Sequence, residues 1–205
     1  MHIKQIPTGR WRENCYVVSN DQKEALIIDP GNDELTIQTY IEKNKLKVYA
    51  ILNTHGHYDH IGAVQYLKKI NSIPFYLHSN DFKLMKSANL YVKIFDGTRL
   101  VEIPSVDYFI DEIETPHWIG KFCVDFIPTP GHTSGSVCIY IDEFLFTGDT
   151  LLKGMVGRLD LPGADKSAIK TSLATIAQLP KKTKVYPGHG QSTTINKESK
   201  TLMLT

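Results

Sequence analysis

One short stretch of the chain concentrates side chains that can bind a metal ion. The run 54–60 reads THGHYDH, and its candidate ligands are His55, His57, Asp59 and His60. An apolar run at 48–52 precedes it and an amphipathic pattern at 61–70 follows it, as expected for a strand that ends where a helix begins. Neutral imidazole suits zinc, and imidazole combined with carboxylate suits zinc or iron. The sequence therefore predicts a metal centre at this junction.

Three later segments repeat the same arrangement. In each, a short apolar run is followed by a glycine-containing turn that carries one histidine or aspartate, namely His132, Asp149 and His189. Glycine permits a sharp turn and a close approach of the backbone. Five unrelated loop histidines are the alternative, but the repeated context argues against it. We expect these side chains to complete a site that starts at residues 54–60.

The composition is that of an ordinary globular protein. Hydrophobic residues make up 41% of the 205 residues and charged residues 22%. This length suits one domain, so we expect residues 1–205 to form a single domain. With 23 Lys and Arg against 22 Asp and Glu, the formal charge of +1 gives no basis for binding nucleic acid or an acidic membrane surface.

The cysteines and the N-terminus indicate the compartment. Cys15, Cys123 and Cys138 form neither a CxxC pair nor an even set, which argues against a disulfide framework. The first residues are too polar and too broken for a signal peptide, and no apolar stretch approaches the length of a membrane span. We therefore expect reduced thiols, a cytoplasmic location and no membrane partner.

The hydrophobic pattern alternates between strands and helices. Strands are expected at 25–28, 48–52, 74–77, 123–127 and 184–186, a hairpin at 136–141 and 144–146, and helices at 33–44, 61–70 and 169–177. This alternation indicates the α/β class. We interpret residues 81–118 as a connection whose short elements the pattern does not place. Residues 196–205 are expected to be a short helix or a frayed tail.

These motifs resemble the metallo-β-lactamase superfamily, and specifically its short, single-domain glyoxalase II-like (hydroxyacylglutathione hydrolase-like) branch. The resemblance extends from Asn14 to His189. It is carried, in chain order, by Asp29-Pro30-Gly31, the run THGHYDH, His132, Asp149 and His189. It implies a four-layer αββα sandwich, in which two β-sheets pack face to face with helices outside. It also implies a metal site on loops at one edge of the sheets.

The resemblance further implies how the ligands divide between two divalent metal ions. One metal would be held by His55, His57 and His132, and the other by Asp59, His60 and His189, with Asp149 bridging both. Asp29 resembles the family residue that orients a ligand. A plain turn is its alternative, since Asp-Pro-Gly is good turn chemistry. Zinc is favoured, while iron and manganese suit the same ligands.

The loop after Asp149 carries a further resemblance. Residues 156–163, VGRLDLPG, resemble the Gly-Arg-x-Asp segment of glyoxalase II-like and persulfide dioxygenase-like proteins. By analogy the loop lies near the site, where Arg158 could pair with Asp160 or with an aspartate ligand. Ion pairs are also commonly structural, so we favour a pair that only shapes the loop.

The implied chemistry is metal-dependent hydrolysis of an activated carbonyl. Two cations sharing Asp149 would lower the pKa of a shared water, so that a metal-bridged hydroxide is available near neutral pH. We predict an enzyme that cleaves a small thioester such as S-lactoylglutathione, with Asp59 as a catalytic residue. The chain ends soon after His189, where true glyoxalase II continues into a domain that helps bind glutathione. Recognition of glutathione is therefore open.

Other readings of the same motifs remain. In a mononuclear iron persulfide dioxygenase, His55, His132 and Asp149 would hold the iron. A lactonase or β-lactamase would be a carbonyl hydrolase with another pocket. No cysteine falls at the position that some zinc β-lactamases use, which argues against that activity. Superfamily nucleases carry basic surfaces that this near-neutral chain does not predict. A flavodiiron module places glutamate where His57 stands.

Overall fold

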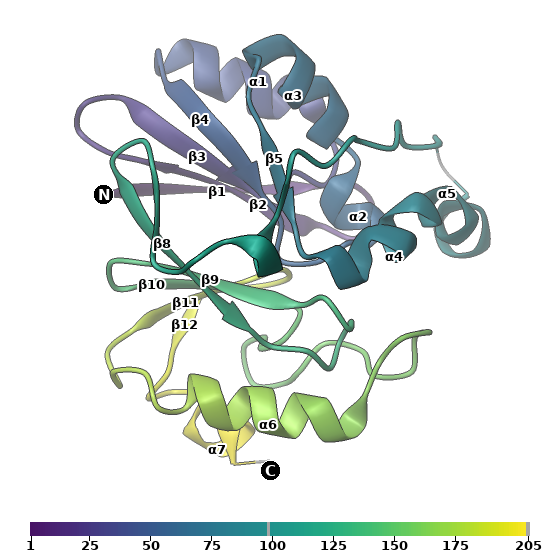
Figure 1. Ribbon diagram of the computed structural model, residues 1–205, viewed down its shortest axis with the longest axis vertical. Coiled ribbons are helices and arrows are strands. Elements are labelled where there is room, and N and C mark those ends of the chain that lie inside the picture. The colour runs from purple at the N-terminus through teal and green to yellow at the C-terminus, as the bar shows by residue number, and fades with distance from the viewer. Residues whose placement is uncertain (98, 204–205) are drawn as a thin grey trace.

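Two six-stranded sheets face each other in the computed structural model, which describes residues 1–97 and 99–203 (Figure 1). The first sheet has the order β1 (His2–Thr8), β2 (Glu13–Ser19), β3 (Glu24–Ile28), β4 (Lys47–Leu52), β5 (Phe75–Leu77) and β6 (Tyr108–Phe109). The second sheet contains β7 (His117–Ile119), β8 (Phe122–Pro128), β9 (Val137–Ile141), β10 (Phe144–Gly148), β11 (Lys184–Pro187) and β12 (Thr193–Thr194), and its spatial order runs from β12 to β7.

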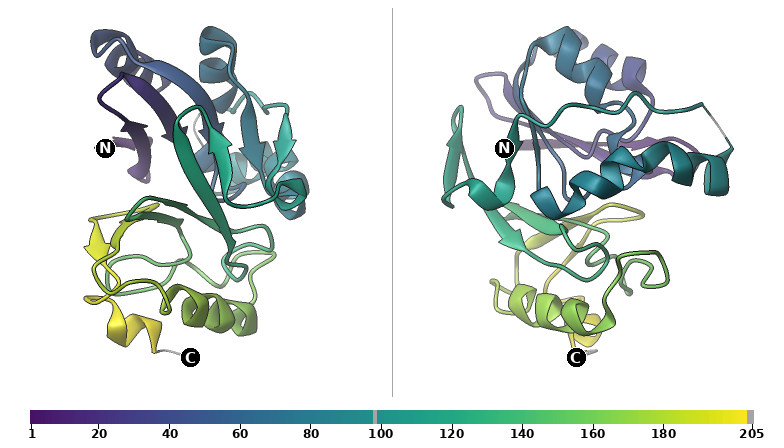
Figure 2. Two further views of the ribbon diagram at one scale, coloured as in Figure 1. Left: turned by 60° about the vertical axis from the view of Figure 1, so that its left-hand side comes forward. Right: turned by 45° about the vertical axis from the view of Figure 1, so that its right-hand side comes forward.

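Helices cover the outer face of each sheet, which gives four layers in all views (Figures 1 and 2). The helices are α1 (Glu34–Lys43), α2 (Tyr58–Ile61), α3 (Val64–Asn71), α4 (Phe82–Lys86), α5 (Ala88–Tyr91), α6 (Lys166–Ile176) and α7 (Ser199–Leu202). Short 3-10 turns lie at Ser79–Asp81 and Ile110–Glu112, and a π-helical turn lies at Val92–Asp96. The expected αββα sandwich is confirmed.

Alternation along the central strands explains the layers. In β3, Ala25 and Ile27 pack against the core under α1 and α3, while Leu26 and Ile28 face the core between the sheets. A strand buried on both faces reads as a continuous apolar run, as the ALII of this strand does. The helix α6 buries Leu173 against the outer face of the second sheet in a third core.

Most expected elements are present within a few residues of their expected bounds. The expected helix at 61–70 instead consists of α2 and α3, interrupted at Gly62. A Cβ at Gly62 would collide with the carbonyl oxygen of Gly31, so the backbone approaches too closely there for any other residue. The pattern also missed β1 and β2, which begin the first sheet.

The segment 81–118 contains more structure than a plain connection. Its described residues form α4, α5, the π-helical turn, β6 and a 3-10 turn, followed by the first residues of β7. In the tail, α7 is a short helix, and residues 204–205 of the expected tail lie outside the described residues.

No helix in the described part of the chain has both the length and the apolar character needed to span a membrane. All three cysteines are free thiols, as the sequence predicts. Burial raises the pKa of Cys138 to about 12 and that of Cys15 well above its usual range, which keeps both thiols protonated and inert.

Candidate metal centre

Strand ends position the predicted ligands. Residues that directly or closely follow strands are Asp29 after β3, His55 after β4, His132 after β8, Asp149 after β10 and His189 after β11. The pair β3 and β4 is parallel, as is the pair β10 and β11, so the strands of each pair end at the same edge of their sheet. The chain also approaches itself closely here, because a Cβ at Gly188 would collide with the Asp149 carboxylate.

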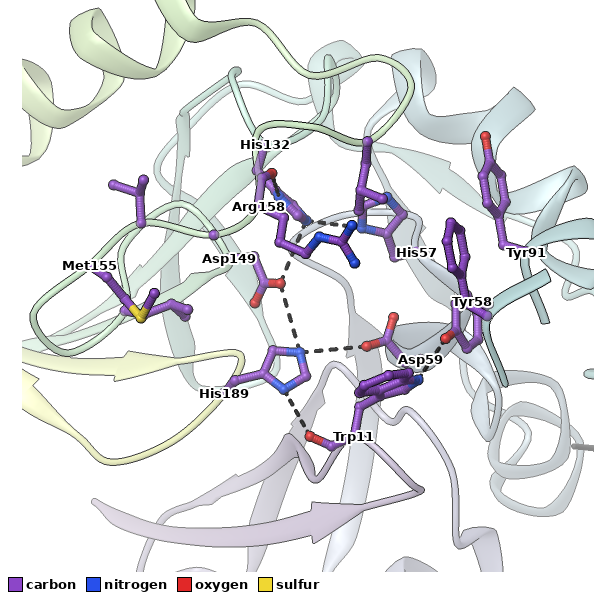
Figure 3. Close-up of a pocket in the computed structure, with 15 residues that line it drawn as sticks. Trp11, His57, Tyr58, Asp59, Tyr91, His132, Asp149, Met155, Arg158 and His189 are labelled. Carbon is purple, nitrogen blue, oxygen red and sulfur yellow. Dashed lines mark hydrogen bonds and ion pairs between the residues drawn. The ribbon is translucent and has the colours of Figure 1, made fainter. Parts of the chain in front are cut away.

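A cavity of about 300 Å³ lies over these strand ends (Figure 3). Five histidine and aspartate side chains line it, and we call them the polar floor: His57, Asp59, His132, Asp149 and His189. Much of the remaining lining is apolar. We call its five large members the apolar wall: Trp11, Tyr58, Tyr91, Phe95 and Met155.

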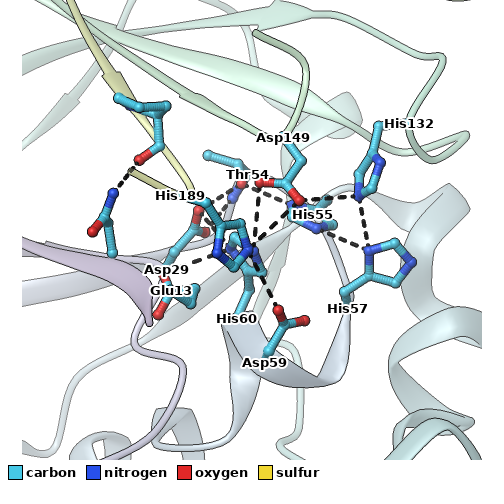
Figure 4. A network of polar contacts seen from close by, with 12 residues as sticks. Glu13, Asp29, Thr54, His55, His57, Asp59, His60, His132, Asp149 and His189 are labelled. Carbon is cyan, nitrogen blue, oxygen red and sulfur yellow. Dashed lines mark hydrogen bonds and ion pairs between the residues drawn. The ribbon is translucent and has the colours of Figure 1, made fainter. Parts of the chain in front are cut away.

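Three histidines turn their ring nitrogens toward one another (Figure 4). His57 Nδ1 lies 3.1 Å from His55 Nε2 and 2.9 Å from His132 Nε2. Two donor atoms on one zinc lie roughly 3–3.5 Å apart, because each metal–ligand bond is about 2.0–2.2 Å long. The three nitrogens therefore have the spacing of ligands around a single cation.

A second cluster adjoins the first. Ligand atoms of Asp59, His60 and His189 lie within 4.8 Å of one another, and His189 Nε2 is 3.5 Å from Asp59 Oδ2. Asp149 lies between the clusters: its Oδ2 is 3.5 Å from His132 Nε2 and 3.7 Å from His189 Nε2. One carboxylate thus reaches both groups, the position that a bridging ligand requires.

Two buried atoms test whether a cation fits this arrangement. His60 Nε2 and Asp149 Oδ1 are both buried, have no hydrogen-bond partner, and lie 3.9 Å apart. Buried polar atoms in native proteins are almost always satisfied, so each orphan needs an explanation. A divalent cation between them would satisfy both. The donor set of imidazoles and carboxylates suits zinc, iron or manganese.

Asp29 holds part of this site in place. Its carboxylate accepts hydrogen bonds from the Thr54 backbone N–H at 2.7 Å and from the Thr54 hydroxyl at 2.6 Å. The same carboxylate lies 3.2 Å from His60 Nδ1. A proton on Nδ1 that is shared with Asp29 leaves Nε2 free as a ligand atom. Asp29 therefore does more than turn the chain.

Asp81, which the sequence pattern did not single out, joins the two ligand-bearing loops. Its Oδ2 accepts hydrogen bonds from the Gly56 N–H at 2.8 Å and the Thr133 hydroxyl at 2.7 Å. Its Oδ1 accepts one from the Gly135 N–H at 2.8 Å. Gly56 lies between His55 and His57, and Thr133 follows His132. A single buried carboxylate thus fixes the loops that carry the three-histidine cluster.

Electrostatics separate the two clusters. Burial lowers the pKa of His57 to about 3 and that of His55 well below its usual range, and neighbouring imidazoles add to the effect. Burial opposes the charge of His60 as well, but Asp29, Asp59 and Glu13 outweigh it and raise the pKa of His60 well above normal. Burial likewise opposes the charge of His189, yet Asp59 and Asp149 raise its pKa. His55 and His57 are therefore neutral, whereas His60 and His189 of the second cluster attract protons.

Arg158 and Asp160 pair with each other. The Arg158 guanidinium donates two hydrogen bonds to the Asp160 carboxylate, at 2.9 and 2.8 Å, and both side chains are largely exposed. The Arg158 carbonyl oxygen lies 2.8 Å from His132 Nδ1, so the backbone of this residue orients a candidate ligand. Asp160 does not line the cavity. The side chains of Arg158 and Asp160 therefore form an ion pair within the loop, in line with a role in shaping the loop. The contact between the Arg158 carbonyl and His132 was not predicted from the sequence.

Sequence patterns missed the apolar wall. Trp11 lies between β1 and β2, and Tyr91 and Phe95 lie in the segment that the pattern did not place. Aromatic residues were visible there, but nothing local marks them as pocket residues. The one sequence feature that could have indicated them is a segment rich in large apolar residues that follows neither a helical nor a strand period.

Comparisons with known proteins agree with this geometry. A family model described as the metallo-beta-lactamase superfamily matches residues 8–189. Hydroxyacylglutathione hydrolase GloC of Haemophilus influenzae is 30% identical over 212 residues, covering 98% of this chain and 96% of its own. The crystal structure of BLEG-1 B3 metallo-beta-lactamase aligns with a TM-score of 0.92 and 38% identity, covering 97% of each chain. TTHA1623, solved in a di-iron-bound form, aligns with a TM-score of 0.84 and 34% identity, covering 97% of this chain and 98% of its own.

Proposed function

We propose a function for this chain from one premise: it belongs to the metallo-beta-lactamase superfamily. Membership and the histidine–aspartate clusters indicate an enzyme of the metallo-hydrolase type that binds divalent metal. Our proposal is more specific than this enzyme class. We propose that residues 1–205 form one domain and that the protein is a dinuclear hydrolase that cleaves a small thioester. The observation that carries it is Asp149, whose carboxylate reaches both ligand clusters.

The ligand assignment is part of the proposal. His55, His57 and His132 would hold one metal, Asp59, His60 and His189 would hold the other, and Asp149 would be shared between them. Bound divalent cations supply Lewis acidity, which lowers the pKa of water toward neutrality and stabilises negative charge on a carbonyl oxygen. Zinc is the metal we favour. The di-iron form of TTHA1623 keeps iron as the alternative.

The chain's own side chains would orient the metal ligands and line the cavity. Asp29 would accept a hydrogen bond from the Nδ1–H of His60 and so keep Nε2 available as a ligand. The Asp59 carboxylate, whose pKa His189, His60 and His57 lower in spite of its burial, stays ionised. An ionised carboxylate at this place could accept a hydrogen bond from the attacking water. No serine or cysteine nucleophile is required. The apolar wall lines one side of the cavity, where a bound substrate would cover it.

The thioester assignment draws on similarity to GloC, whose name states hydroxyacylglutathione hydrolysis. A cytoplasmic location belongs to the same proposal, supported by the free cysteines.

Measurement of thioester hydrolysis together with metal content tests the proposal. Purified protein loaded with zinc is expected to hold two ions per chain and to hydrolyse S-lactoylglutathione or a simpler acyl thioester. Asp59→Ala should lose most of the activity, about a thousandfold, since electrostatic and ligand groups of this kind contribute at that scale. Asp21→Ala, an exposed aspartate on the far loop between β2 and β3, is the matched control. Two bound metals without any thioesterase activity would reject the proposal.

One finding favours a second candidate, β-lactam hydrolysis. The BLEG-1 structure, named a B3 metallo-beta-lactamase, covers 97% of this chain at 38% identity. A chromogenic cephalosporin offered to the same metal-loaded protein distinguishes the two activities by their relative kcat/KM. A persulfide dioxygenase would instead consume oxygen with a glutathione persulfide and hold one iron per chain.

A further inference from the structure

The apolar wall is assembled from separate parts of the chain around the polar floor (Figure 3). Trp11 comes from the loop between β1 and β2, Tyr58 from α2, and Met155 from the loop after β10. Tyr91 ends α5, and Phe95 lies in the π-helical turn that follows it. Several segments therefore contribute large apolar side chains to a single cavity.

Two polar groups of the wall and its rim, the Trp11 indole and the Arg158 guanidinium, are already engaged within the protein. The indole Nε1–H of Trp11 donates to the Tyr58 hydroxyl oxygen at 2.7 Å. The Arg158 guanidinium is occupied by the Asp160 carboxylate and lies 6.0 Å from the centre of the Phe95 ring. Apart from the Tyr58 and Tyr91 hydroxyls, the wall therefore offers a ligand ring and thioether surface.

This surface is unusually exposed for such large side chains. Trp11 is 47% exposed, Phe95 38% and Met155 58%. Covering apolar surface of this kind with a ligand removes it from water, which favours binding. The Tyr91 and Phe95 rings lie nearly parallel, with an interplanar angle of 5° and centroids 6.2 Å apart. They present an ordered surface to an apolar group.

Charge points the same way. Among the described residues that line the cavity, Arg158 is the only lysine or arginine, and its charge is paired with Asp160. Glutathione carries two carboxylates, which would need cationic partners. A cavity of about 300 Å³ also lies at the lower end of the size range for ligand pockets, enough for one compact group.

We propose that the substrate carries a compact apolar or aromatic group close to its scissile carbonyl, that this group packs on the apolar wall, and that a glutathione moiety is not recognised. This inference rests on the proposed function, because it assumes that the carbonyl sits at the polar floor. It makes Phe95 and Trp11 determinants of specificity rather than of chemistry.

Two series of thioesters test the inference. In the first, one uncharged thiol, N-acetylcysteamine, carries acetyl, butanoyl, hexanoyl and phenylacetyl groups. In the second, the same acyl groups are carried by glutathione. We expect kcat/KM to rise about fourfold per added methylene until the cavity is filled, the factor that corresponds to about 0.8 kcal/mol per buried methylene. Glutathione should give no advantage. A flat acyl series or a clear preference for glutathione overturns the inference.

A matched pair of variants links the effect to the wall. Phe95→Ala should reduce kcat/KM for the hexanoyl and phenylacetyl thioesters about tenfold, mostly through KM, and leave the acetyl thioester nearly unchanged. Ile94→Ala is the control, because Ile94 is an adjacent residue that is 60% exposed and does not line the cavity. Equal losses for all acyl groups, or equal effects of the two variants, would contradict a role in specificity.

A binding measurement separates this inference from the proposed function. In a Trp118→Phe background, Trp11 is the remaining tryptophan, and its fluorescence reports ligands on the wall. Phenylalkyl ketones, which have a carbonyl but no leaving group, should bind and shift the signal, and Phe95→Ala should weaken their binding. Ketone binding without hydrolysis of any thioester would reject the proposed function but support a binding role for the apolar wall. Thioester hydrolysis without ketone binding would support the proposed function and reject the role of the wall.

Discussion

The polar floor and the apolar wall share one cavity but are built in opposite ways. The floor residues His57 and His132 are buried, follow strands of the two sheets, and lie in loops that hydrogen bonds to Asp81 fix. The wall residues Trp11, Phe95 and Met155 are exposed and lie on loops and a single helical turn. Side chains held from several directions keep their geometry, whereas exposed ones on short elements can be exchanged.

The difference teaches which part of the site carries which property. A reaction that depends on metal ligands tolerates little displacement, so its residues belong on rigid strand ends. Substrate preference depends on surface shape, which loops can alter without disturbing the fold. The floor should therefore determine whether the protein reacts at all, and the wall should determine with what.

The largest effect is expected at the residue that joins the two clusters. Asp149→Ala removes the carboxylate between His132 and His189, so both metals should bind weakly and kcat should fall about a thousandfold or more. His57→Ala should weaken one metal selectively, because His57 belongs to the three-histidine cluster alone. Metal content after dialysis, measured by mass spectrometry, distinguishes these outcomes. Equal metal loss in the two variants would show that the clusters are not separate sites.

A smaller effect is expected one layer below the floor. Asp81→Asn keeps one acceptor oxygen but replaces the other with an NH2 group, which cannot accept a hydrogen bond from a backbone N–H of the ligand loops, so affinity for one metal should fall about 10–100-fold. Asp111→Asn is the control, because Asp111 also accepts hydrogen bonds, from Ser79, but touches neither ligand loop. Calorimetric titration of both variants with zinc measures the change. A reduced affinity at both sites, or a similar loss in the control, contradicts a local positioning role.

Proton release sharpens the contrast between the clusters. His60 has a raised pKa in the metal-free protein, so a metal must displace its proton, and affinity at that cluster should rise about tenfold per pH unit for each proton released. This rise ends once the pH exceeds the raised pKa. His55 and His57 are neutral already, so metal binding to these two imidazoles should release no proton near pH 6–7, about the usual histidine pKa.

Calorimetry in buffers of different ionisation enthalpy counts the protons that metal binding releases.

The raised pKa of His60 also predicts how the stability of the metal-free protein changes with pH. Because the folded pKa of His60 is raised, its stabilising contribution is complete below the unfolded histidine pKa and is lost as the pH rises through the folded value. A metal-free protein that becomes more stable over that range would oppose this account of the cluster.

The smallest effect is expected for the wall itself, measured as stability. Met155→Ala should change the free energy of unfolding by less than about 0.5 kcal/mol, because Met155 is exposed. Leu173→Ala, which empties a buried position of α6, should cost about 2–5 kcal/mol. Urea unfolding of the two variants provides the comparison. A large loss for Met155→Ala would mean that the wall is part of the core.

Much of the fold and the ligand set could be predicted from sequence. The strand at β4, the helix α1 and the hairpin of β9 and β10 are local patterns, since apolar periodicity and turn residues act between near neighbours. The split of α2 from α3 could not be predicted, because there the Ala63 N–H donates to the carbonyl of Pro30, a residue distant in sequence, instead of to a helical carbonyl. The short elements of 81–118 were missed for the same reason, because they depend on packing against the rest of the fold and show no clear hydrophobic period in the sequence.

By itself the sequence determined the types, order and local context of the candidate ligands, because each motif is a strand followed by a turn and is complete within a few residues. Only the tertiary structure decided that Asp81 ties the His55 and His132 loops together, and that Trp11 and Phe95 face one cavity. The Trp11–Tyr58 hydrogen bond joins residues 47 positions apart. Such contacts depend on how whole segments pack, which no pattern among neighbouring residues records.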